Sequence, residues 1–189
     1  MVFTNRKRGQ SISLNINDNE ILEKSETKCL GVILDNQLNW HAQVKHISNK
    51  ISKSVSILRI LRDIFPKHIL ITLYLTLIYP FLNYCNLIWG SAYNSTLMPL
   101  IILQKKCICL ICNVDFFAHT DPLFKETKLL KLNQMYILNC AKFGYSCYNS
   151  NSYSNFRIRM IQNSQFHRYD TRRKNDIRTP YERLQICQN

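Results

Sequence analysis

Glycine and acidic residues are scarce in this 189-residue chain, and both shortages exclude classes of site. The four glycines lie far apart, so the chain cannot form a glycine-rich phosphate-binding loop of the Walker or Rossmann type. Asp and Glu number only 12 against 25 Lys and Arg, and no two acidic residues are adjacent. A site that holds two metal ions between paired carboxylates is therefore not expected.

An apolar signal core is also missing from residues 1–10, which are largely polar and basic. The eight cysteines are scattered rather than regularly spaced, and Cys107, Cys140 and Cys147 fall within apolar helical patterns. These features predict buried, reduced thiols in an intracellular protein, nuclear or cytoplasmic.

The formal charge of +13 favours an anionic partner, and nucleic acid fits better than a membrane surface or a small-molecule substrate. The hydrophobic fraction of 46% is sufficient for a packed core.

One long stretch, residues 68–104, contains no Lys, Arg, Asp or Glu, and its window 69–89 is long enough to span a bilayer. Pro80 interrupts that window, and its polar residues recur at helical spacing, which favours buried helices with one polar side. The polar residues are Thr72, Thr76, Asn83 and Asn86. A membrane-associated helical protein stays open as an alternative, as does a helical interaction module with no nucleic-acid role.

The pattern of the first 36 residues is β-like. Residues 11–16 alternate polar and apolar, residues 20–23 resume the pattern, and residues 28–34 form a short apolar run. We predict a three-stranded antiparallel unit here.

From Trp40 the apolar period becomes helical. The predicted helices are 40–61 with Asn39 as N-cap, 67–79, 80–89 with Gly90 as a left-handed C-cap, 95–113, one starting at Asp121-Pro122, and 133–148. The expected fold is mainly α (α+β): a small N-terminal antiparallel β unit, a packed bundle of four to six helices, and a flexible basic tail. The expected parts are 1–36, a β-rich edge; 37–113, a helical region; 114–150, a helical extension; and 151–189, a disordered basic tail.

Two groups of basic residues are candidates for binding nucleic acid. The first lies on the polar side of helix 40–61 and comprises Lys45, Lys50, Lys53 and Arg59. The second interleaves charges and rings in the tail, and comprises His167, Arg168, Tyr169, Arg172, Arg173 and Lys174. A solvated tail that contacts nothing is an equal alternative for the second group. The cysteines of residues 107–112 fit a helix core better than a zinc site, and no catalytic or metal-binding residues are predicted.

Taken in order, several segments resemble the C-terminal part of the reverse transcriptase of non-LTR retrotransposons, the jockey-like and related long interspersed elements. These segments are Leu30–Asp35, Leu38–Trp40, His46–Lys53, Leu73–Tyr84, Trp89–Gly90, Leu103–Lys105, Ala118–Phe124, Leu132–Tyr136 and His167–Arg172. The series covers roughly residues 28–174, and its specificity lies in the order rather than in any one segment.

The resemblance implies that residues 29–35 are the hairpin at the palm–thumb junction, where Leu30, Gly31 and Val32 would hold the primer end. It implies that residues 40–113 are the thumb, which grips a DNA or RNA duplex by its phosphates. Intact enzymes of the family bind Mg²⁺ through a palm Asp-Asp motif, and this chain has no Asp-Asp. We therefore expect a non-catalytic, truncated fragment with no cofactor of its own and residual nucleic-acid binding.

Overall fold

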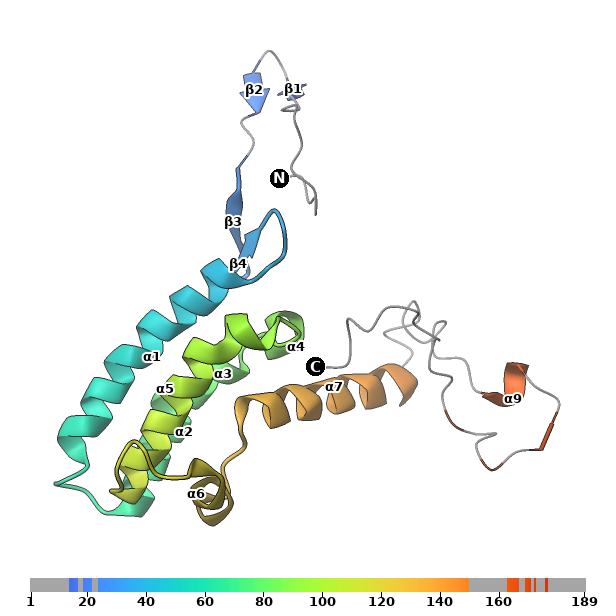
Figure 1. Ribbon diagram of the computed structural model, residues 1–189. Coiled ribbons are helices and arrows are strands. Elements are labelled where there is room, and N and C mark those ends of the chain that lie inside the picture. Colours follow the sequence, from blue (N-terminus) through green and yellow to red (C-terminus); the bar gives the residue numbers. More distant parts are fainter. Residues whose placement is uncertain are drawn as a thin grey trace. The chain divides into compact units, whose positions relative to one another are not determined.

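The computed structural model describes residues 14–16, 19–21, 24–149, 163–166, 169–170, 172 and 176 (Figure 1). The chain divides into two compact units, Met1–Tyr136 and Ile137–Asn189, and each is described by itself. Within the second unit, α9 (Asn163–Phe166) is a short helix whose Asn163 N–H donates to the carbonyl of Asp176 at 3.1 Å.

The described strands form two separate hairpins, so the predicted three-stranded unit is wrong. β1 (Leu14–Ile16) pairs with β2 (Asn19–Ile21), and β3 (Glu26–Cys29) pairs with β4 (Val32–Asp35), both antiparallel. The apolar run 28–34 is not one strand because Leu30 and Gly31 have φ values of 47° and 83°. Positive φ at both central residues is what a two-residue type I′ hairpin turn requires.

The prediction of a mainly α chain with a small N-terminal antiparallel β unit is confirmed. The helices of the described residues before α9 are α1 (His41–Leu61), α2 (Lys67–Leu77), α3 (Tyr79–Asn83), α4 (Asn86–Trp89), α5 (Asn94–Cys112), α6 (Thr120–Thr127) and α7 (Leu132–Asn149). They exceed the expected four to six because the helix predicted over 80–89 is divided. Tyr84 is extended and Cys85 has a φ of 51°, which separates α3 from α4.

Three predicted helix ends differ from the structure. The N-cap of α1 is Trp40, at a φ of 67°, although the Asn39 side chain still accepts from the His41 N–H at 3.0 Å. α6 begins at Thr120, so Asp121 lies inside its first turn rather than capping it. Gly90 is right-handed, with a φ of −69°, and is no left-handed cap.

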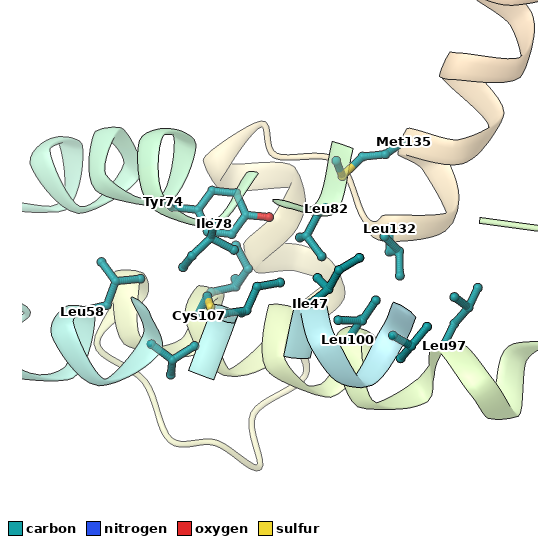
Figure 2. Close-up of a cluster of buried hydrophobic side chains, with 14 of the residues drawn as sticks. Ile47, Leu58, Tyr74, Ile78, Leu82, Leu97, Leu100, Cys107, Leu132 and Met135 are labelled. Atoms are coloured by element: carbon teal, nitrogen blue, oxygen red, sulfur yellow. The ribbon is translucent and has the colours of Figure 1, made fainter. Parts of the chain in front are cut away.

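The core lies where α1, α2, α3, α5 and the start of α7 meet, and Figure 2 shows its side chains converging from these helices. Ile51 of α1, Tyr74 of α2, Leu82 of α3 and Leu100 of α5 are all fully buried. Each fully buried aliphatic side chain of this size contributes about 1.5–3 kcal/mol of transfer free energy. The apolar stripe of the sequence therefore becomes the face along which α1 packs.

One buried amide links the helices through hydrogen bonds. The Gln104 Nε2 of α5 donates to the Tyr74 hydroxyl of α2 and to the Leu130 carbonyl, both at 2.9 Å. Its Oε1 accepts from the Leu132 N–H at the start of α7, also at 2.9 Å. Burial also raises the pKa of the Tyr74 phenol well above its usual value, so the phenol stays protonated.

The window 69–89 is not a single helix, because α2, α3 and α4 share it. Among the described residues, α5 alone is long and apolar enough to cross a membrane, and half of its apolar window is buried inside the protein. A core helix has the same length and composition, so α5 by itself does not indicate a membrane.

Replacing Gly90 with alanine is expected to destabilise the protein by about 1–3 kcal/mol. An added Cβ would lie 2.4 Å from the Asn86 carbonyl oxygen and 2.7 Å from the Tyr136 ring. Gly144→Ala in α7 is the matched control, since its Cβ would meet nothing within 4 Å, and it should stabilise by up to about 1 kcal/mol. Urea unfolding followed by circular dichroism measures both. Equal effects of the two substitutions would contradict this packing.

Gln104→Leu is expected to lower the free energy of unfolding by about 3 kcal/mol, because it leaves three polar partners unpaired, two of them, the Tyr74 hydroxyl and the Leu132 N–H, buried. The control is Gln134→Leu, since Gln134 is an exposed amide that accepts one hydrogen bond from the Lys131 N–H. Gln134→Leu should lower the free energy of unfolding by less than about 1 kcal/mol. A Gln104→Leu protein as stable as the control would show that the buried amide is dispensable.

Candidate nucleic-acid interface

The four basic residues predicted on the first long helix are all exposed on α1. Its opposite side is buried through Val44, Ile47, Ile51, Val55 and Leu58, so packing fixes which side faces solvent. Lys45, Lys50, Lys53 and Arg59 are thus available to an external anion.

The four residues do not form one row. At 3.6 residues per turn, Lys50 and Lys53 lie within about 60° of each other around the axis, whereas Arg59 lies about 180° from Lys50. Lys45 and Arg59 share a side but are about 21 Å apart along the helix, at 1.5 Å per residue. The structure therefore brings Lys50 and Lys53 together and separates them from the other two.

Two of the cations are positioned by aromatic rings. The Lys50 Nζ lies 5.3 Å from the centre of the Phe81 ring of α3, and the Arg59 guanidinium lies 6.0 Å from that of Phe116. Such contacts are worth about 0.5–1 kcal/mol at exposed sites. Each ring holds its cation beside α1 without neutralising it.

Most carboxylates in the described range 24–149 are engaged elsewhere. Asp63 pairs with Arg62, Asp121 with Lys131, and Glu126 with Lys67. In the described part of the chain, no carboxylate lies within salt-bridge distance of the four α1 cations. The positive charge of these four residues is therefore not neutralised by a carboxylate in the described part of the chain.

A hairpin formed by β3 and β4 stands where the resemblance predicted one, and its three candidate residues differ in exposure. Leu30 is 85% exposed at the tip and Gly31 is exposed, whereas Val32 is 4% exposed and belongs to the core. The Val32 side chain thus anchors the hairpin and cannot itself touch a duplex. The Tyr84 hydroxyl donates to the Leu30 carbonyl at 2.5 Å, which fixes the tip.

Two polar side chains fix the base of this hairpin to α1. The Gln43 Oε1 accepts from the Ile33 N–H at 2.8 Å. The buried Asp35 carboxylate accepts from the Gln37, Asn39 and Trp40 N–H groups at 3.0–3.1 Å. Hairpin and helix therefore form one positioned surface.

Two further basic side chains, absent from the predicted site, belong to this surface. His46 lies one turn after Gln43 on α1, and Lys28 of β3 is paired with Ile33 of β4. Partial burial, and then the positive charges of Lys50 and Lys28, lower the pKa of His46 below its usual 6.5. The spacing of His46, Lys50 and Lys53 at i, i+4 and i+7 was visible in the sequence, but the position of Lys28 depends on the hairpin register.

The predicted tail site is only partly described. Tyr169 is 78% exposed and Arg172 is exposed. His167, Arg168, Arg173 and Lys174 lie outside the described residues.

The described cysteines are free thiols, but only Cys107, Cys109 and Cys147 are buried, whereas Cys140 is half-buried and Cys29 is exposed, so the prediction of buried thiols holds only in part. Burial raises the pKa of Cys107 to about 12 and also raises that of Cys109, so both stay protonated at neutral pH. Within the described residues, no three His, Cys, Asp or Glu side chains converge on one point.

Comparison of the chain with protein-family models, with curated proteins and with solved structures found no match.

Lys50→Gln is expected to raise the pKa of His46 toward 6.5, because one of the two repelling charges is removed. The control is Lys45→Gln, which removes the same charge from the adjacent position on another side of α1. NMR titration of the imidazole signals measures both. An unchanged His46 pKa in Lys50→Gln would contradict the arrangement.

The lowered pKa also sets a pH dependence of stability. The unfolded chain binds a proton at His46 before the folded chain does, so His46 should reduce stability as pH falls below about 6.5.

Proposed function

We propose that this chain is a non-catalytic part of an RNA-directed DNA polymerase of the non-LTR retrotransposon type, and that it holds a nucleic-acid duplex. The observation that carries the proposal is the pair of exposed lysines Lys50 and Lys53 on α1, whose charges have no carboxylate partner among the described residues. The ordered motif series of residues 28–174 supports the assignment to this family.

The interface suits backbone contacts rather than base reading. Lysine ammonium groups on a helix surface bind phosphate oxygens by charge, which gives affinity without sequence information. The hairpin β3–β4 lies at the N-terminal end of α1 (Figure 1), so a duplex lying along the helix would also meet the exposed tip at Leu30. The duplex would thus be held along α1 and at the tip.

We assign no nucleotide-addition step to this chain. The sequence contains no adjacent aspartates, and most carboxylates in the described range 24–149 are engaged singly, by backbone N–H groups or basic side chains. Incorporation of nucleotides by the purified chain with Mg²⁺ and a primer–template would contradict the non-catalytic part of the proposal.

The binding test compares two double variants with equal charge loss. Lys50→Gln with Lys53→Gln should weaken binding to a DNA–RNA duplex and reduce the slope of log affinity against log salt by about two units, at about 0.9 per phosphate contact. The control is Lys105→Gln with Lys106→Gln, which removes two exposed lysines of α5. The control should keep the slope of the unmodified protein. Fluorescence anisotropy at several salt concentrations measures all three.

Three results would count against the proposal. Absence of salt-dependent binding by the unmodified protein at low ionic strength would remove the nucleic-acid role and leave the helical interaction module. Equal losses in both double variants would show that net charge, not α1, sets the affinity. Recovery of the protein only in detergent would favour the membrane alternative.

A further inference from the structure

Three basic residues lie on the two elements that meet where the hairpin β3–β4 joins α1. His46 and Lys50 are one turn apart on one side of α1. Lys28 stands on β3 opposite Ile33, whose N–H donates to Gln43 one turn before His46. Lys28 and Lys50 are 22 positions apart in the chain, but in the fold partial burial and then the charges of both lysines lower the pKa of His46.

The elements that carry these residues are fixed before any ligand arrives. The hairpin is held at its base by Gln43 and at its tip by Tyr84. Lys50 is held over the Phe81 ring. A ligand therefore need not order the backbone that carries these residues, which lowers the entropic cost of binding.

The acidic groups on the packed elements leave these three residues free for an anion. Asp35 of β4 is buried and its carboxylate is occupied by backbone N–H groups. Glu26 of β3 lies two residues from Lys28 on the same side of the strand, and it is exposed with no ion pair among the residues that the structure describes. The exposed charges at the junction, Lys28 and Lys50 against Glu26, remain net positive.

We propose that Lys28, His46 and Lys50 form a phosphate-binding site at the hairpin–helix junction, and that His46 takes up a proton when a backbone phosphodiester occupies it. The proposal deepens the proposed function and rests on it for the choice of nucleic acid as the source of the phosphate. Binding at this site depends on pH through His46, whereas Lys45, Lys53 and Arg59 stay charged over the same pH range.

The proton balance follows from electrostatics. In the free protein, partial burial and then the two lysines disfavour the charged imidazole and lower the pKa of His46, so the neutral form predominates at pH 7. A phosphodiester carries one negative charge and offsets that repulsion, so the imidazole binds a proton from solvent and donates an N–H to the phosphate. Affinity must then rise as pH falls, by up to tenfold for each unit by which the phosphate raises the pKa of His46.

The test measures duplex affinity at two pH values either side of the free His46 pKa, at constant ionic strength. The unmodified protein should bind several-fold more tightly at the lower pH, and His46→Gln should abolish that difference. His41→Gln is the matched control, because His41 is exposed on the same helix and should leave the pH dependence unchanged. Lys28→Gln supplies an independent variant on the hairpin and should weaken binding at both pH values.

A second arm follows the His46 imidazole by NMR with inorganic sulfate, a divalent anion that does not titrate in this range. A rise in the His46 pKa with sulfate, without any duplex binding, would keep the anion site and overturn the proposed function. Duplex binding with the same pH dependence in His46→Gln would overturn the site and leave the proposed function standing. If the protein bound no duplex and sulfate left the His46 pKa unchanged, both the anion site and the proposed function would be overturned.

Vesicles of phosphatidylserine and phosphatidylcholine form the third arm. Binding to these vesicles, with a His46-dependent pH response and no binding to the duplex, would identify a lipid headgroup as the phosphate source and overturn the nucleic-acid assignment.

Discussion

The side-chain amide of Gln104 is the polar centre on which the packing of the first unit depends. Its two hydrogen bonds as donor and one as acceptor join α5 to α2 and to the start of α7. A buried amide with unpaired atoms would cost free energy, whereas a fully paired one specifies a single arrangement of its partners. Apolar contacts alone would permit α2 and α7 to slide along α5. The paired amide fixes their register.

A second polar constraint transmits that order to the surface. Because α1 packs on α5 and carries Gln43, the hairpin β3–β4 is held in a defined place beside the helix. Asp35 strengthens the joint by accepting three backbone N–H groups at the start of α1. The packing of α1 in the core thus determines the position of the charged surface formed by α1 and the hairpin. This surface is where we place the contact with nucleic acid.

The helical part of the fold could largely be predicted, because α1, α2, α5 and α7 follow long apolar periods that burial then enforces. The points at which helices and strands are interrupted could not be predicted. Cys85 adopts a left-handed backbone inside a helical pattern, and Leu30 with Gly31 reverses a run that reads as one strand. Asp121 resembles a cap in sequence, but its carboxylate pairs with Lys131, which holds its pKa below the usual value. The sequence pattern around a residue does not show which distant residue will pair with it.

The sequence by itself determined the excess of base, the lack of paired acids, and the side of α1 that faces solvent, because composition and helical period are local properties. Only the tertiary structure decided which charges act together. It separated Arg59 from Lys50, buried Val32, and brought the hairpin that carries Lys28 beside the helix that carries His46. Such neighbours depend on strand register and on hydrogen bonds such as Gln43 to Ile33, which join positions far apart in the chain. No spacing along a single element encodes them.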